Sequence, residues 1–322
     1  MTVLLTACTS ETMSAPPSSF ARSTFTQEGL AFLDRANVAV VTGGNQLIVP
    51  QTAADTTFDL RSWAFQGPSG YPFTLGEDSS PLSGAVTVGG SLSSDLPDES
   101  WDYLYHENRQ AGDGIRVVAS DWTATFDLSL TNVWDGYNPR VEDGTEQDNT
   151  GKFLLSGCYF DWVHDDAVEN DDLMSGTVRD CLFNDVFVGF SEEPSSGNDY
   201  TNHGSVLTLR DVIARFSPNV YGGVLGTGKV FKWSDASGSV DARNCIFLFD
   251  DNTNQSESSQ EFPPGTYEDI TIVLGPDFEG SWPVPLPAGV TVTRDMTVFT
   301  DARDAWLARM GYPPAPQVSS SP

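Results

Sequence analysis

Short segments of alternating apolar and polar residues recur along this chain, each interrupted by one residue of a bend-forming type. In each segment an apolar and a polar residue precede Asn, Asp or Gly, and apolar residues return directly afterwards. The bend positions are Asn132, Gly157, Asp180, Asp211, Asn244 and Asp269. These residue types adopt a positive φ at low cost, and the flanking alternation has the period of a β-strand. The pattern predicts a repeated unit of strand, one-residue bend and strand.

The spacing of the bends separates a coiled chain from a hairpin protein. Successive bend residues are 25, 23, 31, 33 and 25 positions apart, whereas hairpins place a turn every 8–12 residues or so. We therefore predict an all-β parallel β-helix, a solenoid whose coils stack roughly 4.8 Å apart. The alternative is an irregular β-sandwich. In the solenoid, one inward column would contain Val133, Cys158, Cys181, Val212, Cys245 and Ile270.

The same pattern divides the chain into three parts. Residues 1–25 read as a lipoprotein-like signal remnant followed by a flexible tether rich in Ser, Thr and Pro. Residues 26–311 are predicted to form a single β-helix domain, with the clearest coils at 130–275. Residues 312–322 are predicted to be a disordered tail.

A β-helix has to cover its end coils, because an open end exposes strand edges and core. We expect a short capping helix within residues 28–37, followed by strands at 38–42 and 46–49. The proline-rich residues 276–287 should interrupt the pattern, and 290–299 reads as a further strand. At the other end we expect a capping helix over 302–310. Its N-cap would be Asp301, and Gly311 would end it.

The first residues contain Leu5-Thr6-Ala7-Cys8, which resembles a bacterial lipobox with Cys8 as the lipidated residue. A charged region and a longer apolar run are expected before such a motif. We therefore predict that the natural start lies upstream. The prediction is an exported bacterial protein, either an outer-membrane lipoprotein or a periplasmic or extracellular protein. The alternative is a cytosolic chain with a chance match.

The net charge limits the classes of partner, and the cysteines are expected to have a packing role. The chain has 45 acidic and 16 basic residues, a net charge of −29. This charge argues against nucleic acid and anionic membrane surfaces, so a membrane would be reached only through the lipid anchor. Cys158, Cys181 and Cys245 share one repeat position and are expected to be small inward fillers. We expect a monomer.

Candidate chemistry concentrates at residues 161–172. From Asp161 to Glu193 there are ten carboxylates and one arginine. Crowded carboxylates raise one another's pKa, which allows one to act as a general acid at neutral pH. The same residues could bind Ca²⁺, with Asp171 and Asp172 as candidate ligands. A solvated acidic turn is the structural alternative.

Stacking of the repeats would bring a second acidic position to this segment. We align Trp134–Tyr137 with Asp165–Val168 and with Phe187–Phe190 as successive coils. This alignment puts Asp135 one strand spacing from Asp166, where two carboxyl groups share a proton or a cation.

Residues from other coils complete the candidate site. Lys232 precedes a bend, where it would act as a base, neutralise a sugar acid or form a simple ion pair. Trp134, Trp162 and Trp233 are candidate sugar-stacking platforms, with core packing as the alternative. The candidate catalytic residues are Asp135, Asp165, Asp166, Glu169 and Lys232, and the candidate substrate-binding residues are Trp134, Arg140, His164, His203 and Trp233.

The coil pattern resembles that of the pectin-lyase-like superfamily of right-handed parallel β-helix proteins. Trp134–Gly136, His164–Asp172 and Phe231–Ser234 look like segments of secreted bacterial members. This resemblance implies a right-handed coil and activity on a polysaccharide. Polygalacturonases of the superfamily carry four motifs in order, of which only Asp165-Asp166 and His203-Gly204 have counterparts here. The calcium-dependent pectate lyases use an arginine base, and none stands out here.

Three functions follow as hypotheses. The first is a glycoside hydrolase or polysaccharide lyase, the hydrolase using Asp166 with Asp135, Asp165 or Glu169, and the lyase using Lys232 or His203 as base. The second is a non-catalytic glycan-binding or adhesin-like surface protein stabilised by Ca²⁺. The third is a structural spacer without a ligand.

Overall fold

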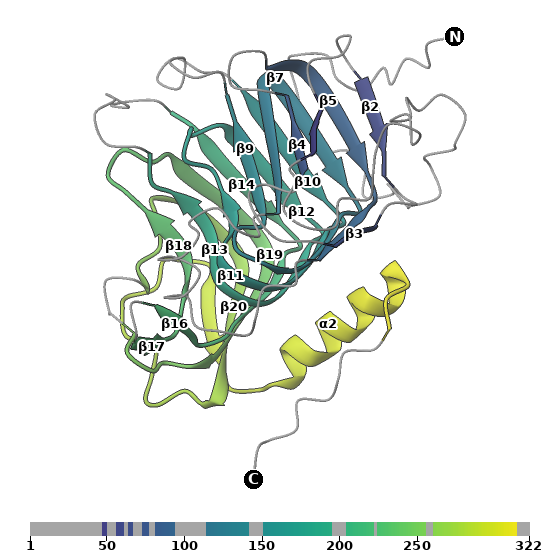
Figure 1. The fold of residues 1–322 in the computed structure, drawn as a ribbon. Coiled ribbons are helices and arrows are strands. Elements are labelled where there is room, and N and C mark those ends of the chain that lie inside the picture. Colours follow the sequence, from purple (N-terminus) through teal and green to yellow (C-terminus); the bar gives the residue numbers. More distant parts are fainter. Residues whose placement is uncertain are drawn as a thin grey trace.

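The protein is mostly β-strand, with one helix near the C-terminal end of the described residues (Figure 1). The structure is a computed structural model. It describes residues 47–49, 56–60, 64–66, 73–76, 81–93, 114–141, 151–194, 204–221, 224–255 and 260–313. These residues confirm the all-β prediction and the prediction of a C-terminal helix.

Most strands belong to one parallel, barrel-like sheet, which has nineteen strands among the described residues. The strands of this sheet are β1 Leu47–Val49, β2 Thr56–Asp59, β3 Ala64–Gln66, β4 Phe73–Leu75, β5 Leu82–Val88, β6 Ser91–Ser93, β7 Ile115–Phe126, β8 Ser129–Val133, β9 Tyr137–Arg140, β10 Lys152–Ser156, β11 Tyr159–Glu169, β12 Ser175–Arg179, β13 Leu182–Glu192, β14 Val206–Arg210, β15 Ile213–Phe216, β18 Lys229–Trp233, β19 Ser239–Asp251, β20 Gly265–Asp277 and β21 Val290–Thr293. A separate antiparallel hairpin consists of β16 Asn219–Tyr221 and β17 Val224–Gly226.

Each strand of the sheet pairs in parallel with strands one repeat earlier or later in the chain. In β10, for example, Lys152 lies opposite Trp122 of β7 and opposite Ser175 of β12. The pairings form three ladders. These run β2-β5-β7-β10-β12-β14-β19-β20, β3-β6-β8-β11-β13-β15-β19-β20-β21 and β1-β4-β7-β9-β11-β13-β18. The predicted parallel arrangement is therefore confirmed.

The six predicted bend residues all have a left-handed backbone. Their φ values are 53° at Asn132, 68° at Gly157, 51° at Asp180, 54° at Asp211, 52° at Asn244 and 54° at Asp269. The conformation allows a strand of the first ladder to turn directly into the second ladder. The residue types Asn, Asp and Gly were thus a reliable signal of the bend.

The first repeat was nevertheless aligned wrongly. The residue equivalent to Gly157 is Asp127, which has φ 55°. Asn132 lies in a second bend, at the level of Trp162 and Asp185, both also left-handed. The two bends have the same local sequence signature, so the pattern alone could not separate them.

The predicted inward column exists, with one substitution. Four buried members follow Cys158 at equivalent positions of successive repeats: Cys181, Val212, Cys245 and Ile270. Leu128 occupies the position given to Val133, which is buried in a different column opposite Val163. The three cysteines are free and buried, as expected of small fillers.

Aromatic side chains form a further stack through the core. The rings of Phe160 and Phe183, from adjacent strands, lie 4.9 Å apart and nearly parallel. Phe190 and Phe231 lie 5.9 Å apart on the third ladder. Because parallel in-register strands repeat every 4.8 Å or so, equivalent rings stack face to face without adjusting the backbone.

The C-terminal helix differs from the prediction in both extent and position. Helix α2 spans Thr297–Met310, begins five residues earlier than expected, and takes Met296 rather than Asp301 at its N-cap. It ends as predicted at Gly311, with φ 76°. Asp295 accepts hydrogen bonds from the backbone and hydroxyl of Thr297, which stabilises the first turn.

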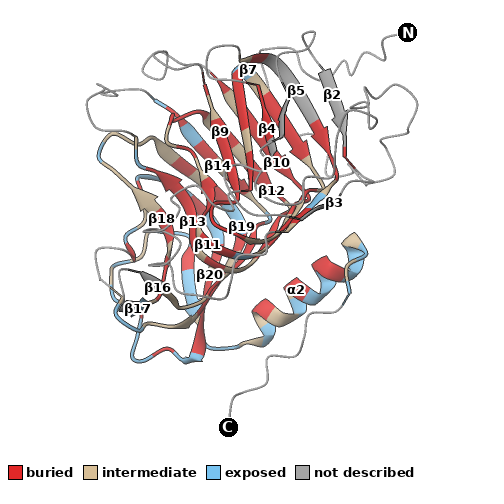
Figure 2. Cartoon of the chain, in the orientation of Figure 1, coloured by how far each residue is buried: buried red, intermediate tan, exposed pale blue. Residues whose placement is uncertain are grey.

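Helix α2 does not close an end of the sheet. It lies along an outer face, where its buried side packs on strands from several repeats (Figures 1 and 2). The buried members of this contact are Leu182, Ile213, Leu248, Val273, Phe299, Trp306 and Leu307. The helix therefore covers apolar residues that the second ladder presents outward.

The remaining fold predictions have mixed outcomes. The expected strand at 46–49 is β1, and no strand occurs between Asp277 and Val290, as the prolines predicted. The expected strand at 290–299 ends at Thr293. The N-terminal capping helix, the strand at 38–42, the tether, Cys8 and the tail beyond Pro313 lie outside the described residues. Among the described helices, none has the length and apolarity needed to span a membrane.

Candidate functional site

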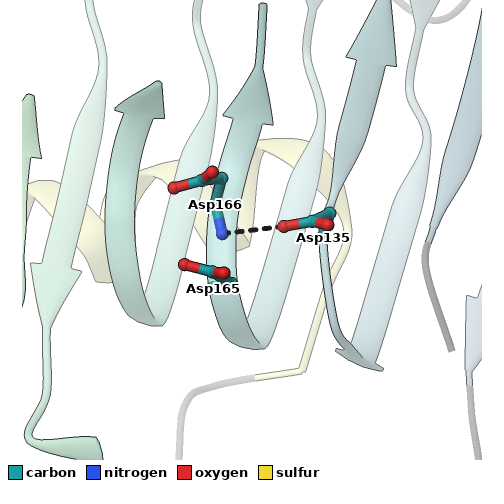
Figure 3. A group of neighbouring side chains, drawn as sticks. All are labelled: Asp135, Asp165 and Asp166. Atoms are coloured by element: carbon teal, nitrogen blue, oxygen red, sulfur yellow. Dashed lines mark hydrogen bonds between the residues drawn. The ribbon is translucent and has the colours of Figure 1, made fainter. Parts of the chain in front are cut away.

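Three aspartates from two neighbouring chain segments converge on one side of the sheet (Figure 3). Asp165 and Asp166 lie on β11, and Asp135 lies between β8 and β9. One carboxylate oxygen from each lies within 4.8 Å of the others. Asp135 and Asp166 are buried, whereas Asp165 is half-buried. We call these residues the acidic triad.

Backbone pairing brings Asp135 beside Asp166, as the alignment predicted. Tyr137 lies opposite Val168, which places Asp135 level with Asp166, and Asp166 lies opposite Val188. The backbone N–H of Asp166 donates to Asp135 Oδ1 over 3.1 Å. The N–H of Gly136 donates to the Asp166 carbonyl over 2.8 Å.

A glycine is required at position 136. A Cβ atom there would lie only 2.4 Å from the Ala167 carbonyl oxygen. Gly136 therefore permits the close approach of two backbones that sets the distance between Asp135 and Asp166.

Lys232 reaches the triad from β18, two strands beyond β11 in the third ladder. Its Nζ lies 3.2 Å from Asp166 Oδ2 and 3.9 Å from Glu193 Oε2. Burial alone would lower the pKa of Lys232, but the negative charges of Asp166, Asp165 and Glu193 outweigh it and raise the pKa above its ordinary value. Lys232 is therefore held as an ammonium ion.

Asp166 is the most deeply placed carboxyl of the triad, with 2% of its surface exposed. Burial raises its pKa, and the nearby ammonium of Lys232 opposes that rise without cancelling it. Oδ2 is paired with Lys232, while the buried Oδ1 makes no hydrogen bond within the described part of the chain. One oxygen of Asp166 is therefore fixed by Lys232, and the other is enclosed by the protein.

The two acids expected to bind calcium have other partners. Asp172 is buried, and its Oδ2 lies 3.1 Å from Arg140 Nε and accepts a hydrogen bond from the Val141 N–H. This pairing gives Asp172 and Arg140 a structural role, and their predicted metal and substrate roles stay predictions. Asp171 Oδ1 accepts a hydrogen bond from the Glu193 N–H. Burial, followed by the charge of Asp166, raises the pKa of Asp171 to about 6.

Glu169 lies further along β11 and is half-buried. Its carboxylate accepts a hydrogen bond from the side-chain amide of Asn138, which lies on β9. Glu169 also lies opposite Ser191, as the alignment predicted. It is not a member of the triad, so its predicted catalytic role receives less support than those of the three aspartates.

Two predicted substrate-binding side chains are buried instead. Trp134 is 7% exposed and offers little ring surface to solvent, although its carbonyl accepts the Asp165 N–H. His164 is 2% exposed, and its Nε2 lies 2.7 Å from Asn132 Oδ1. Both residues position the chain around the triad. In the sequence, a tryptophan or histidine that is buried in the fold looks the same as one that binds a substrate. The sequence alone therefore could not separate the two roles.

Trp233 and His203 complete the predicted set. Trp233 is half-buried, packs edge-on against Phe231 and donates from Nε1 to the Gly238 carbonyl. Its ring is thus largely committed to the fold. His203 lies outside the described residues.

The structure adds two residues that sequence reasoning did not propose. Asn219 of the β16–β17 hairpin donates to the His164 carbonyl over 2.9 Å, which joins the hairpin to the site. Glu192 is buried beneath the site, where its Oε1 accepts a hydrogen bond from Asn170. Burial raises the Glu192 pKa to about 8. No local motif marked either residue, because each contact joins segments more than 20 positions apart.

The triad offers three carboxylates, a ligand type that suits Ca²⁺. Lys232, however, already places a positive charge 3.2 Å from Asp166. The Lys232 ammonium offsets part of the negative charge that a second cation would meet. The described geometry therefore fits both proton transfer and cation binding.

Comparison of this chain with protein-family models, with curated proteins and with solved structures gives no match. The geometry of the site is therefore the basis on which a function is proposed.

Proposed function

We propose that this protein is a glycoside hydrolase that cleaves a polysaccharide with the acidic triad. The observation that supports this most is the triad itself, three carboxylates with oxygens within 4.8 Å of one another and Lys232 beside them. Glycosidases commonly use two carboxyl groups, one protonated and one ionised. Carboxyl groups that differ in burial can hold a protonated and an ionised form side by side, and the three members of the triad differ in burial.

The fold that we propose is a right-handed parallel β-helix of the pectin-lyase-like kind. Three parallel ladders that pair each strand with one repeat earlier and later support this proposal. So do left-handed bends at equivalent positions in successive repeats. Such a solenoid presents side chains from consecutive coils on one long face, where an extended glycan fits.

Within this proposal Asp166 is the general acid. Burial raises its pKa, which favours the protonated form that donates to the leaving oxygen. Asp165 is half-buried and so more accessible than its neighbours, which suits the carboxylate that faces the sugar. Oxygens within 4.8 Å are nearer to the roughly 5–5.5 Å of retaining enzymes than to the 6.5–9.5 Å or so of inverting ones. We therefore propose retention of configuration.

Hydrolysis is favoured over β-elimination by the state of Lys232. A lyase needs an unprotonated base, but the surrounding carboxylates raise the pKa of Lys232. The ammonium instead orients Asp166 through its contact with Oδ2, and it opposes the rise in the Asp166 pKa without cancelling it.

We further propose that the protein is exported and anchored through Cys8, that it works as a monomer, and that it needs no metal. The support for anchoring is the Leu5-Thr6-Ala7-Cys8 motif and the Ser/Pro-rich residues after it. Incorporation of a labelled fatty acid into the protein, but not into Cys8→Ala, would support the anchor. Unchanged labelling of that variant would contradict it.

The experiment is a polysaccharide screen with purified protein, following both reducing ends and the absorbance of unsaturated products. We expect reducing ends without unsaturated products. Asp166→Asn should lower kcat by at least about a hundredfold, because it removes the proton donor. Its melting temperature should stay within a few degrees of the wild type. Asp277→Asn, a change of the same chemistry at an exposed position, is the matched control and should keep full activity.

Three results would contradict the proposal. Unsaturated products would indicate a lyase. An Asp166→Asn variant with unchanged kcat would remove the triad from the chemistry. Calcium that raises the melting temperature of the wild type but not of Asp166→Asn would favour the calcium-stabilised glycan-binding protein.

A further inference from the structure

Trp162 combines an exposed ring with a strained backbone. Its side chain is 44% exposed, and its φ is +56°. The equivalent bend positions on adjacent strands hold Asn132 and Asp185, residue types that adopt this conformation at low cost. A bulky aromatic residue is strained in this conformation. The conformation of the bend therefore does not explain why this position holds a tryptophan.

The Trp162 ring has a fixed support. Its centroid lies 5.8 Å from that of the His164 ring, with the planes tilted by 40°. His164 is held by Asn132 at Nε2 and by Asn219 at its carbonyl. These contacts join two strands and the β16–β17 hairpin behind the ring. An indole that is supported in this way and still exposed is preorganised to receive a flat apolar partner.

Trp162 is also close to the acidic triad. Trp162 lies three positions before Asp165, so their Cα atoms are at most about 10 Å apart. A glycan that is bound at the triad can reach the indole with a neighbouring sugar unit. The ring therefore lies where a second subsite would be expected.

The charges around Trp162 restrict the sugar that can bind. Asp161 precedes it, Asp185 stands at the equivalent bend, and Asp165 of the triad follows three positions later. Two cations of the described residues are already engaged, Arg215 by Asp185 and Asp250, and Lys232 by Asp166. A uronate would therefore bring a further negative charge beside these carboxylates, at a cost in binding.

We propose that Trp162 is the stacking platform of a subsite for an uncharged pyranose ring beside the acidic triad. This proposal rests on the proposed hydrolase function and names its substrate class as a neutral polysaccharide. The apolar C–H face of the sugar would pack on the indole, while its hydroxyl groups stay in water or reach the nearby polar side chains.

The test is affinity electrophoresis in gels that contain either a neutral polysaccharide (a glucan or a mannan) or an anionic one (polygalacturonate or alginate). Asp166→Asn serves as the parent protein, so that the gel polysaccharide is not degraded. We expect the parent to be retarded by a neutral glycan. Addition of Trp162→Ala should weaken that binding at least fivefold or so, and Trp162→Phe should weaken it less.

Trp162→Asn is the most informative variant, since it copies Asn132. It should relieve the strained backbone and raise the urea midpoint, yet lose retardation as Trp162→Ala does. Higher stability with weaker binding is not expected of a residue that only shields His164.

The outcomes separate this inference from the hydrolase proposal. If the wild type cleaves a neutral glycan while Trp162→Ala keeps its KM and its retardation, the subsite is wrong and the hydrolase stands. If nothing is cleaved but a neutral glycan retards the protein through Trp162, the hydrolase is wrong and the subsite stands. Retardation by uronates alone, or by no glycan, overturns the inference.

Discussion

At the residue scale, the partners of the acidic side chains decide what these side chains can do. Asp172 and Asp166 are equally buried, at 2% exposed, but Asp172 is matched by Arg140 and a backbone N–H. Asp166 has one paired oxygen and one buried oxygen that makes no hydrogen bond in the described part of the chain. Both residues belong to the same acidic run, and only their partners from other strands distinguish a structural acid from a candidate catalytic one.

Glu192 provides a prediction about pH. Its folded pKa of about 8 lies above the ordinary value of 4.5, so the folded state binds a proton more tightly than the unfolded state. This contribution to stability is fully present below about pH 4.5 and is lost as pH rises to about 8, at roughly 1.4 kcal/mol per pH unit. Glu192→Gln should flatten this fall in unfolding free energy, measured by urea denaturation between about pH 5 and 8.

The flattening will be partial, since Asp171 contributes a slope of the same sign up to about pH 6. Exposed Glu279 offers a matched control, and Glu279→Gln should leave the slope unchanged. A Glu192→Gln protein with the wild-type slope would show that Glu192 is already ionised in the folded state at neutral pH.

At the element scale, the outward face of the second ladder explains the position of helix α2. Strands of this ladder carry apolar residues on both faces, such as buried Leu182 and Phe183 side by side on β13. One face fills the core and the other is covered by α2. The sequence indicated the helix and its end at Gly311, but not its position, because the side chains that it covers are spread over four strands.

Trp306 anchors that helix and gives a prediction about stability. It is 2% exposed, and its Nε1 donates to the Asp180 carbonyl over 3.1 Å. Trp306→Ala should lower the unfolding free energy by about 3–5 kcal/mol, as large-to-small core changes do. The neighbouring change Arg309→Ala should cost about 1 kcal/mol or less, because its pair with Asp180 is exposed. Urea midpoints measure both. Equal effects of the two variants would mean that the helix is not held by its apolar side.

At the scale of the whole molecule, repetition made part of the structure predictable. The bend residues predicted the strands, the parallel pairing and most of the cysteine column, since Asn, Asp or Gly occupies most bends, with Trp162 as an exception. The same repetition caused the error at Asn132, where two kinds of bend look alike. The triad followed from the correct alignment of Asp135 with Asp166, whereas the approach of Lys232 and the burial of His164 depended on three-dimensional packing.

The net charge of −29 gives a prediction for the molecule as a whole. Repulsion among an excess of carboxylates destabilises the compact state, and 1 M salt shortens the screening length to about 3 Å. We expect the melting temperature to rise by at least about 2–4 °C between 0.05 and 1 M NaCl, corresponding to roughly 1 kcal/mol. Tetramethylammonium chloride at equal ionic strength should act similarly. A flat or falling melting temperature would mean that ion pairs such as that of Arg215 outweigh the repulsion.

The buried cysteine column also allows the order in which the repeats open to be measured. Cys158, Cys181 and Cys245 are free thiols with no exposed surface. Cys158 lies between β10 and β11, Cys181 lies between β12 and β13, and Cys245 lies on β19. A thiol reagent can reach each of them only when its own repeat opens. The order in which the three sites are alkylated, read by mass spectrometry, would therefore report whether the repeats separate one by one or all at once.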